Sequence, residues 1–170
     1  AAQLQLEYKE SIENYRVAED GSHKGYTRYG QFAGDPYTDW DASFVNFCMY
    51  YAGLASSEMF PEEMNTADWY NKFVEADGGN KIVYLTADKD YEPEAGDIVF
   101  FEKENEETET QMGIVSSYNK ENQELKVIEG NSDNQVKENT YDVNDEHISE
   151  YLKITDMEEE YKGLDEEPDE

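Results

Sequence analysis

The stretch DWDASFVNFCMYYAG, residues 39–53, says more about the fold than any other part of the chain. From Asp41 onward it predicts a helix that ends at Gly53, because glycine readily adopts the left-handed conformation of a helix C-cap. One face of this helix would carry Ala42, Val45, Cys48, Met49 and Ala52, and another would carry Phe44, Phe47 and Tyr51. A helix that is apolar on nearly all sides packs inside a domain. We therefore expect a central helix here.

The segment before this helix predicts another helix and a loop. Four apolar residues recur at helical spacing near the N-terminus: Leu4, Tyr8, Ile12 and Tyr15. This periodicity predicts a first amphipathic helix. Residues 25–39 are rich in Gly, Tyr and Thr, and this composition predicts an ordered loop that leads into the central helix.

The segment after the central helix predicts a third helix. Thr66 is a suitable N-cap residue, and the glycines at 78–79 would end the helix. Its inward-facing residues would be Trp69, Phe73 and Val74.

After this third helix the period of the apolar residues changes. Short β-rich runs are separated by turns, and they are residues 82–85, 98–101, 113–118, 125–129, 135–141 and 148–154. Helices followed by consecutive strands are typical of the α+β class, with N-terminal helices packed on an antiparallel β-sheet of about five to six strands. The 14 Tyr and 2 Trp residues supply apolar area for one core, so we expect residues 1–155 to form a single domain.

The chain is strongly acidic, with 42 Asp and Glu residues against 13 Lys and Arg and a net charge of -29. This charge excludes nucleic-acid binding, because a phosphate backbone needs cations to displace its counterions. No apolar run is long enough to cross a bilayer, so we expect no membrane insertion. Residues 156–170 are mostly acidic and predict a solvated tail or a linker to a further module. A cationic protein or peptide is the kind of partner that this charge attracts.

Five short motifs occur in an order and spacing that resemble one known family. They are Tyr26–Gly30, Asp39–Cys48 with Gly53 after it, Pro93–Phe101, Gln111–Val115 and Val127–Asn131. The family is CHAP, the cysteine, histidine-dependent amidohydrolase/peptidase domain of bacterial cell-wall hydrolases, and the resemblance extends over residues 26–154. It implies a papain-like fold, peptidoglycan or a peptide as ligand, and an extracellular or cell-surface location in a bacterium.

The resemblance also implies a catalytic cysteine at position 41, a catalytic histidine at position 111 and an orienting residue at Glu129 or Asn131. This chain has Asp41 and Gln111 at the first two positions. A carboxylate is a far poorer nucleophile than a thiolate, and an amide cannot exchange a proton near neutral pH. We therefore expect a pseudoenzyme: an inactive CHAP-like domain that serves as a binding or structural module of a larger secreted or surface protein.

Two alternatives use the same positions. Asp41 and Glu129 would suit an active cell-wall hydrolase, such as a peptidoglycan amidase, an endopeptidase or a carboxylate-based glycosidase, which needs carboxyl groups roughly 5 to 10 Å apart. Asp41, Gln111, Glu129 and Asn131 also offer oxygen ligands of the kind that calcium prefers, but no run matches a calcium-binding loop. We therefore predict neither a metal nor a cofactor. The simplest role for Asp41 is to stabilise the first turn of its helix.

For the remaining candidate residues, a structural role explains the sequence at least as well as a functional one. Trp40 and Tyr29 are candidate stacking surfaces for a peptide or glycan, and they are at least as good candidates for the core. Cys48 would lie about 10 Å along the helix from position 41, and its apolar neighbours predict an inert core thiol. The two histidines, His23 and His147, lie in polar segments and predict surface roles.

Overall fold

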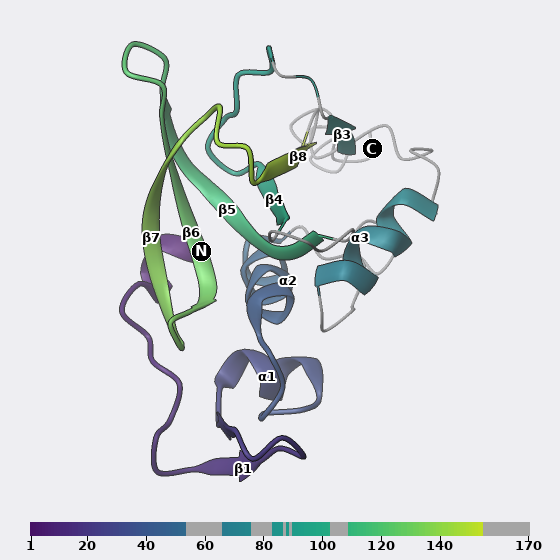
Figure 1. Ribbon diagram of the computed structural model, residues 1–170, viewed down its shortest axis with the longest axis vertical. Coiled ribbons are helices and arrows are strands. Elements are labelled where there is room, and N and C mark those ends of the chain that lie inside the picture. Colours follow the sequence, from purple (N-terminus) through teal and green to yellow (C-terminus); the bar gives the residue numbers. More distant parts are fainter. Residues whose placement is uncertain (54–65, 76–82, 87, 89, 103–108, 155–170) are drawn as a thin grey trace, which may run out of the picture.

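The computed structural model describes residues 1–53, 66–75, 83–86, 88, 90–102 and 109–154 (Figure 1). The chain belongs to the α+β class, as predicted. Its helices are a short 3-10 helix over Ala2–Gln5, α1 over Arg28–Ala33, α2 over Asp41–Tyr51 and α3 over Thr66–Glu75. Its strands are β1 (Tyr15–Val17), β2 (His23–Gly25), β3 (Val83–Thr86), β4 (Ile98–Glu102), β5 (Glu109–Asn119), β6 (Glu124–Ser132), β7 (Gln135–Asp142) and β8 (Ile148–Ile154).

Six strands form one antiparallel sheet in the order β3-β8-β4-β5-β6-β7. Each of the six predicted strands is present, although β5 and β6 are longer than predicted and residue 82 lies outside the described part. Ile98 of β4 is opposite Ile114 of β5, which is opposite Ile128 of β6. Because side chains alternate along a strand, this register places all three on one face of the sheet.

Helix α2 is central, and it packs across β5 and β6 with α1 and α3 beside it (Figure 1). It begins at Asp41, and Gly53 has a φ of 80°, so both predicted ends are confirmed. Seven of its eleven residues are buried, whereas Tyr50 and Tyr51 at its end are 54% and 64% exposed. Helix α3 buries Trp69 as predicted. The side chains of Phe73 and Val74 and the glycines at 78–79 lie outside the described part.

The predicted N-terminal helix over residues 4–15 is wrong. Only Ala2–Gln5 is helical, and the chain then runs beside β7, where Val136 N–H donates to the carbonyl of Tyr8 at 2.8 Å. Leu4 and Ile12, which the helical spacing placed on a buried face, are 86% and 91% exposed.

Glu10 explains why this segment stays extended. Its Oε1 accepts a hydrogen bond from Gly25 N–H at 2.5 Å, and its Oε2 accepts one from Trp40 Nε1–H at 3.0 Å. A charged side chain with two anchoring hydrogen bonds outweighs a weak periodicity of apolar residues. The segment then enters the β1–β2 hairpin, which the sequence did not predict.

The predicted loop over residues 25–39 contains helix α1. Thr27 caps its start, since the Thr27 Oγ1 accepts a hydrogen bond from Gly30 N–H at 2.9 Å. Gly34 ends it with a φ of 101°. Gly34, one of the glycines that suggested a loop, therefore marks the end of a six-residue helix.

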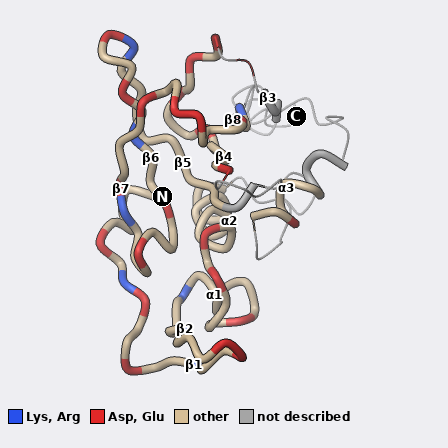
Figure 2. Tube along the Cα trace, in the orientation of Figure 1, with Lys and Arg blue, Asp and Glu red and all other residues tan. Residues whose placement is uncertain are grey.

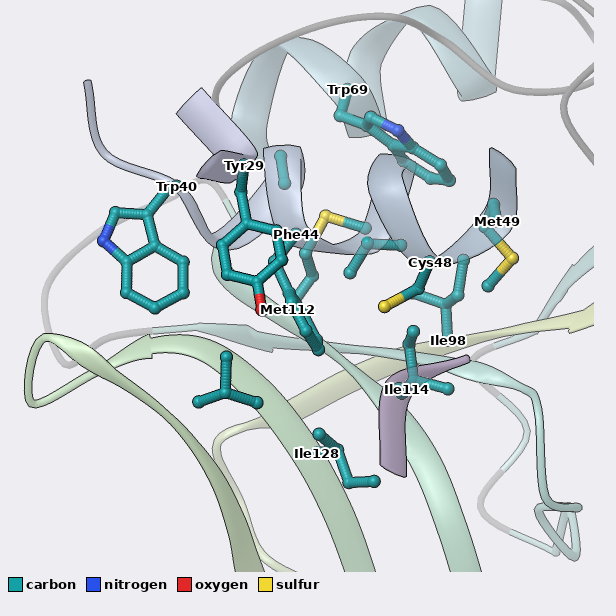
Figure 3. Packing of buried hydrophobic residues seen from close by; sticks show 14 of the residues in the cluster. Tyr29, Trp40, Phe44, Cys48, Met49, Trp69, Ile98, Met112, Ile114 and Ile128 are labelled. Carbon is teal, nitrogen blue, oxygen red and sulfur yellow. The ribbon is translucent and has the colours of Figure 1, made fainter. Parts of the chain in front are cut away.

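Apolar side chains pack on both faces of the sheet. The helix-covered face joins residues of α1, α2 and α3 to those of the strands, and Figure 3 shows part of this packing around Phe44 and Met112. The second face carries a separate cluster: Val99, Phe101, Val115, Leu125, Val127, Ile148 and Tyr151. No helix among the described residues is long and apolar enough to span a membrane.

Candidate functional site

Asp41 is the first residue of α2, and only 8% of it is exposed. One of its carboxyl oxygens, Oδ2, accepts a hydrogen bond from the hydroxyl of Thr66, the first residue of α3. Burial raises the pKa of the Asp41 carboxyl, and the hydrogen bonds from Thr66 and the backbone of Ala42 act in the opposite direction. Asp41 therefore ties the starts of two helices together.

Glu129 of β6 is 1% exposed, and three side chains donate hydrogen bonds to it. Gln111 Nε2 donates to Oε2 at 2.7 Å, whereas Asn139 Nδ2 at 2.9 Å and Tyr141 Oη at 2.7 Å donate to Oε1. Burial raises the pKa of the Glu129 carboxyl, and the three donors lower it. We call these four residues the Glu129 cluster. Their hydrogen bonds offset much of the cost of burying the carboxyl.

The Glu129 cluster lies on the second face of the sheet. Met112 packs in the core under the helices, so its neighbour Gln111 points to the other face. Gln111 is opposite Phe101 in the ladder, and the Phe101 ring packs against Tyr141 with 4.8 Å between ring centroids. Gly113 leaves room for the cluster, because a Cβ at this position would lie 2.8 Å from Cγ of Glu129.

Asp41 and the Glu129 cluster are two separate hydrogen-bonded groups. Within the described part of the chain no hydrogen bond joins them. The two groups are connected by packing, since Gly130 follows Glu129 and lies against Phe44, one helical turn after Asp41. A Cβ at position 130 would lie 2.4 Å from Cβ of Phe44. The sheet and α2 therefore touch directly at Gly130 and Phe44, which are the near neighbours of the two carboxyl residues in the sequence.

Asn131 has a left-handed backbone conformation, with a φ of 59°, near the end of β6. The pairing register of β6 with β7 shifts between Glu129 and Ser132, so Asn131 lies in this irregularity. Asparagine tolerates the left-handed region better than most residues do. The visible role of Asn131 is thus to shape the approach to the β6–β7 turn.

Trp40 and Tyr29 are fully buried, and their rings stack with 5.2 Å between centroids (Figure 3). Trp40 donates to Glu10, and the Tyr29 hydroxyl donates to Gln5 Oε1 at 3.1 Å. Burial raises the pKa of Tyr29 to about 12. Both rings therefore belong to the core, and this corrects the expectation that they offer stacking surfaces to a ligand.

The only thiol and the two imidazoles lie where the sequence analysis expected them. Cys48 is 2% exposed, and burial raises the pKa of its thiol to about 12, so it is inert near neutral pH. His23 lies exposed on β2 and stacks on Tyr15, with 4.1 Å between ring centroids. His147 Nδ1 lies 2.9 Å from Asp145 Oδ1 in the turn before β8.

The burial of the Asp41 and Glu129 carboxyl groups matters for the two alternatives, a carboxylate-based hydrolase and a calcium site. A carboxylate pair that acts on a sugar must be open to the substrate. Glu129, with both oxygens hydrogen-bonded, and Asp41, bonded to Thr66, are closed to it. The described residues also contain no group of three or more His, Cys, Asp or Glu side chains arranged to hold a metal ion. In particular, Asp41 and the Glu129 cluster do not form one ligand set.

Sequence reasoning missed Thr66, Asn139 and Tyr141 as partners of the two carboxyl groups. Residues 139 and 141 lie on one face of β7, and β7 pairs with β6, the strand that carries Glu129, so their spacing held a signal for them. The contact between Thr66 and Asp41 joins two helices that residues 52–65 separate in the sequence, and no local pattern predicts it. No protein-family model matches this chain, and no curated protein matches it either.

Proposed function

We propose that this chain is a papain-like domain of the CHAP type without its catalytic groups, and that it serves as a binding or structural module of a bacterial secreted or cell-surface protein. One observation carries the proposal. The two positions that the resemblance assigns to the nucleophile and the base hold Asp41 and Gln111, and both side chains are engaged in hydrogen bonds within the protein.

The chemistry of the two positions supports the loss of amidase activity. A cysteine at a helix N-terminus is activated because the helix dipole and a nearby imidazole favour the thiolate. Asp41 has the same place at the start of α2, but its carboxyl is buried and bonded to Thr66. It therefore holds the two helices together and presents no reactive atom to a substrate.

Gln111 reproduces one property of the imidazole that it replaces. A catalytic histidine is oriented by a carboxylate or amide that accepts its ring N–H. Gln111 donates its amide N–H to Glu129 in the corresponding way, at 2.7 Å. The amide has no site that accepts and returns a proton near neutral pH, so it retains the structural hydrogen bond and not the proton transfer.

The order of the elements is compatible with the resemblance, whereas the side chains at the three positions are divided between the two faces of the sheet, with Asp41 on the helix side and Gln111 and Glu129 on the other. A central helix that begins at Asp41 packs across β5 and β6, the strands that carry Gln111 and Glu129. These are the elements on which a papain-like domain places its nucleophile, its base and its orienting residue. The papain-like topology itself remains part of the proposal.

Peptidoglycan digestion tests the proposal. Purified protein is incubated with insoluble peptidoglycan and with amide peptides, and the released soluble fragments and free amines are measured. We expect no release above buffer for wild type, Asp41→Asn, Glu129→Gln or the surface control Ile12→Ser. Turnover by wild type that is lost in Asp41→Asn or Glu129→Gln and kept in Ile12→Ser would contradict the proposal, because it would show a working carboxylate pair.

A further inference from the structure

Four aromatic rings form a continuous cluster on the surface of α1 and α2. We call it the aromatic patch, and its members are Phe32, Phe47, Tyr50 and Tyr51. Phe32, Tyr50 and Tyr51 are 42%, 54% and 64% exposed, and Phe47 is half-buried among them. Centroids of adjacent rings lie 4.5 to 5.5 Å apart. Large contiguous aromatic surface of this kind marks an interaction site more often than scattered exposed rings do.

The angles between the rings indicate what kind of partner fits. Phe32 and Phe47 meet at 83°, and Tyr50 and Tyr51 meet at 79°. The other two contacts are tilted at 59° and 45°, so no two adjacent rings share a plane. The patch therefore contains no flat platform made of two or more coplanar rings. An uneven surface of ring faces and edges instead receives inserted side chains, as in protein interfaces rich in Tyr and Phe.

The charge around the aromatic patch also indicates which kind of partner can bind there. Residues 42–53 carry no charged side chain, whereas the whole chain has a net charge of -29. Figure 2 shows Asp and Glu on the loops and strands around this uncharged part of α2. Such a field repels a second copy of the chain and an anionic lipid surface, and it attracts cations. The faces of Tyr and Phe rings bind Lys and Arg side chains directly.

We propose that the aromatic patch is the docking surface for a cationic protein or peptide, whose apolar and Lys or Arg side chains contact the four rings. The acidic surface steers the partner to the domain, and the rings supply the short-range contacts that hold it. This inference goes beyond the loss of catalysis and does not depend on Asp41 or Gln111. Peptide binding tests the docking surface, whereas turnover of peptidoglycan or peptides tests the proposed function. A failure of one proposal can therefore be told from a failure of the other.

Calorimetric titration with three blocked peptides of equal length tests the docking surface. One alternates Lys and Leu, the second alternates Glu and Leu, and the third contains Lys alone. The test variant is Tyr50→Ser/Tyr51→Ser, and the matched control is Leu4→Ser/Ile12→Ser, which removes apolar residues that are 86% and 91% exposed elsewhere. We expect wild type to bind the Lys-Leu peptide about tenfold more tightly than either other peptide. The test variant should lose about tenfold in affinity, and the control should stay within about twofold.

Several outcomes would overturn the docking surface. Equal binding of the Lys-only peptide, or equal losses in the two double variants, would show attraction by charge alone. Sedimentation that finds wild type dimeric and the Tyr50→Ser/Tyr51→Ser protein monomeric would assign the patch to a second copy of the chain. If the double variant does not fold, Tyr51→Ser alone, at the most exposed ring, replaces it and should lose affinity in the same direction.

Discussion

The chain buries two carboxyl groups at the positions of interest, and it satisfies them in different ways. Asp41 lies at a junction of two helices and accepts one side-chain hydrogen bond, from Thr66. Glu129 lies on the sheet and accepts three, from Gln111 on β5 and from Asn139 and Tyr141 on β7. Glu129 therefore holds three neighbouring strands to one another, whereas Asp41, among the described residues, joins the starts of two helices. We therefore expect the sheet to depend on its buried carboxyl more than the helices depend on theirs.

The contact between the two regions should be the most sensitive to change. Gly130→Ala would place a Cβ 2.4 Å from Cβ of Phe44, and neither backbone-proximal atom can move far. We expect a loss of about 3 kcal/mol in the free energy of unfolding, measured by urea denaturation, because overpacking displaces α2 from the sheet. In the comparison variant Gly21→Ala the new Cβ meets nothing within 4 Å, and the φ of 84° at this position costs only about 1 kcal/mol of backbone strain, so the loss should be smaller. Equal losses in the two variants would contradict the close packing of α2 on β6.

Removing one donor should weaken the Glu129 cluster. Tyr141→Phe keeps the ring against Phe101 and deletes the hydroxyl that donates to Glu129 at 2.7 Å. We expect a loss of about 2 kcal/mol in unfolding free energy, since hydrogen bonds to a buried charged group are among the stronger ones. Tyr15→Phe, at a half-exposed ring on the hairpin, is the control and should change stability little. A Tyr141→Phe protein as stable as wild type would mean that Glu129 needs only two donors.

Removing the side-chain donor beside Asp41 should lower the free energy of unfolding less than removing one beside Glu129. Thr66→Val keeps the shape of the side chain and removes the hydroxyl that donates to Asp41. We expect a loss of about 1 kcal/mol in unfolding free energy, because the carboxyl keeps a hydrogen bond from the backbone of Ala42. If urea denaturation shows a larger loss here than in Tyr141→Phe, the ranking of the two regions is wrong.

The pH dependence of stability should also separate the sheet carboxyl from an ordinary one. Burial raises the pKa of Glu129 above its usual 4.5, so the folded protein holds this proton more tightly than the unfolded chain does. The resulting stability is fully present below pH 4.5 and is lost as the pH rises through the folded-state pKa. Relative to Glu129→Gln, which cannot titrate, wild type should therefore lose unfolding free energy over this range. A difference that is constant with pH would contradict the raised pKa.

The strands and the central helix were predictable because their signals are local. The β-rich runs from Ile98 to Phe101 and from Ile148 to Ile154 are each bounded by turn residues. The central helix combines apolar faces with a glycine cap at Gly53. The N-terminal segment was not predictable in this way. The anchor that keeps it extended, Glu10, finds its partners at Gly25 and Trp40, and such distant contacts leave no periodic trace.

The candidate site shows the same division. Gln111 and Glu129 were singled out from their motifs, and the structure brings them together. Asp41 is separate from them because its helix packs on one face of the sheet and the Glu129 cluster lies on the other, and the motifs alone do not say which face the helix covers. Cys48 was predicted correctly as a core thiol, because its place among apolar neighbours is a property of the helix itself.

The unfolding free energy of Glu129→Leu tests most directly the central claim that this region has a structural role and no catalytic one. An active-site carboxylate is commonly held at a cost to stability, so replacing it leaves the protein as stable or makes it more stable. The Glu129 cluster instead predicts a loss of about 3 kcal/mol, because Gln111, Asn139 and Tyr141 lose their acceptor together. A Glu129→Leu protein that unfolds at the same or a higher urea concentration than wild type would contradict this account.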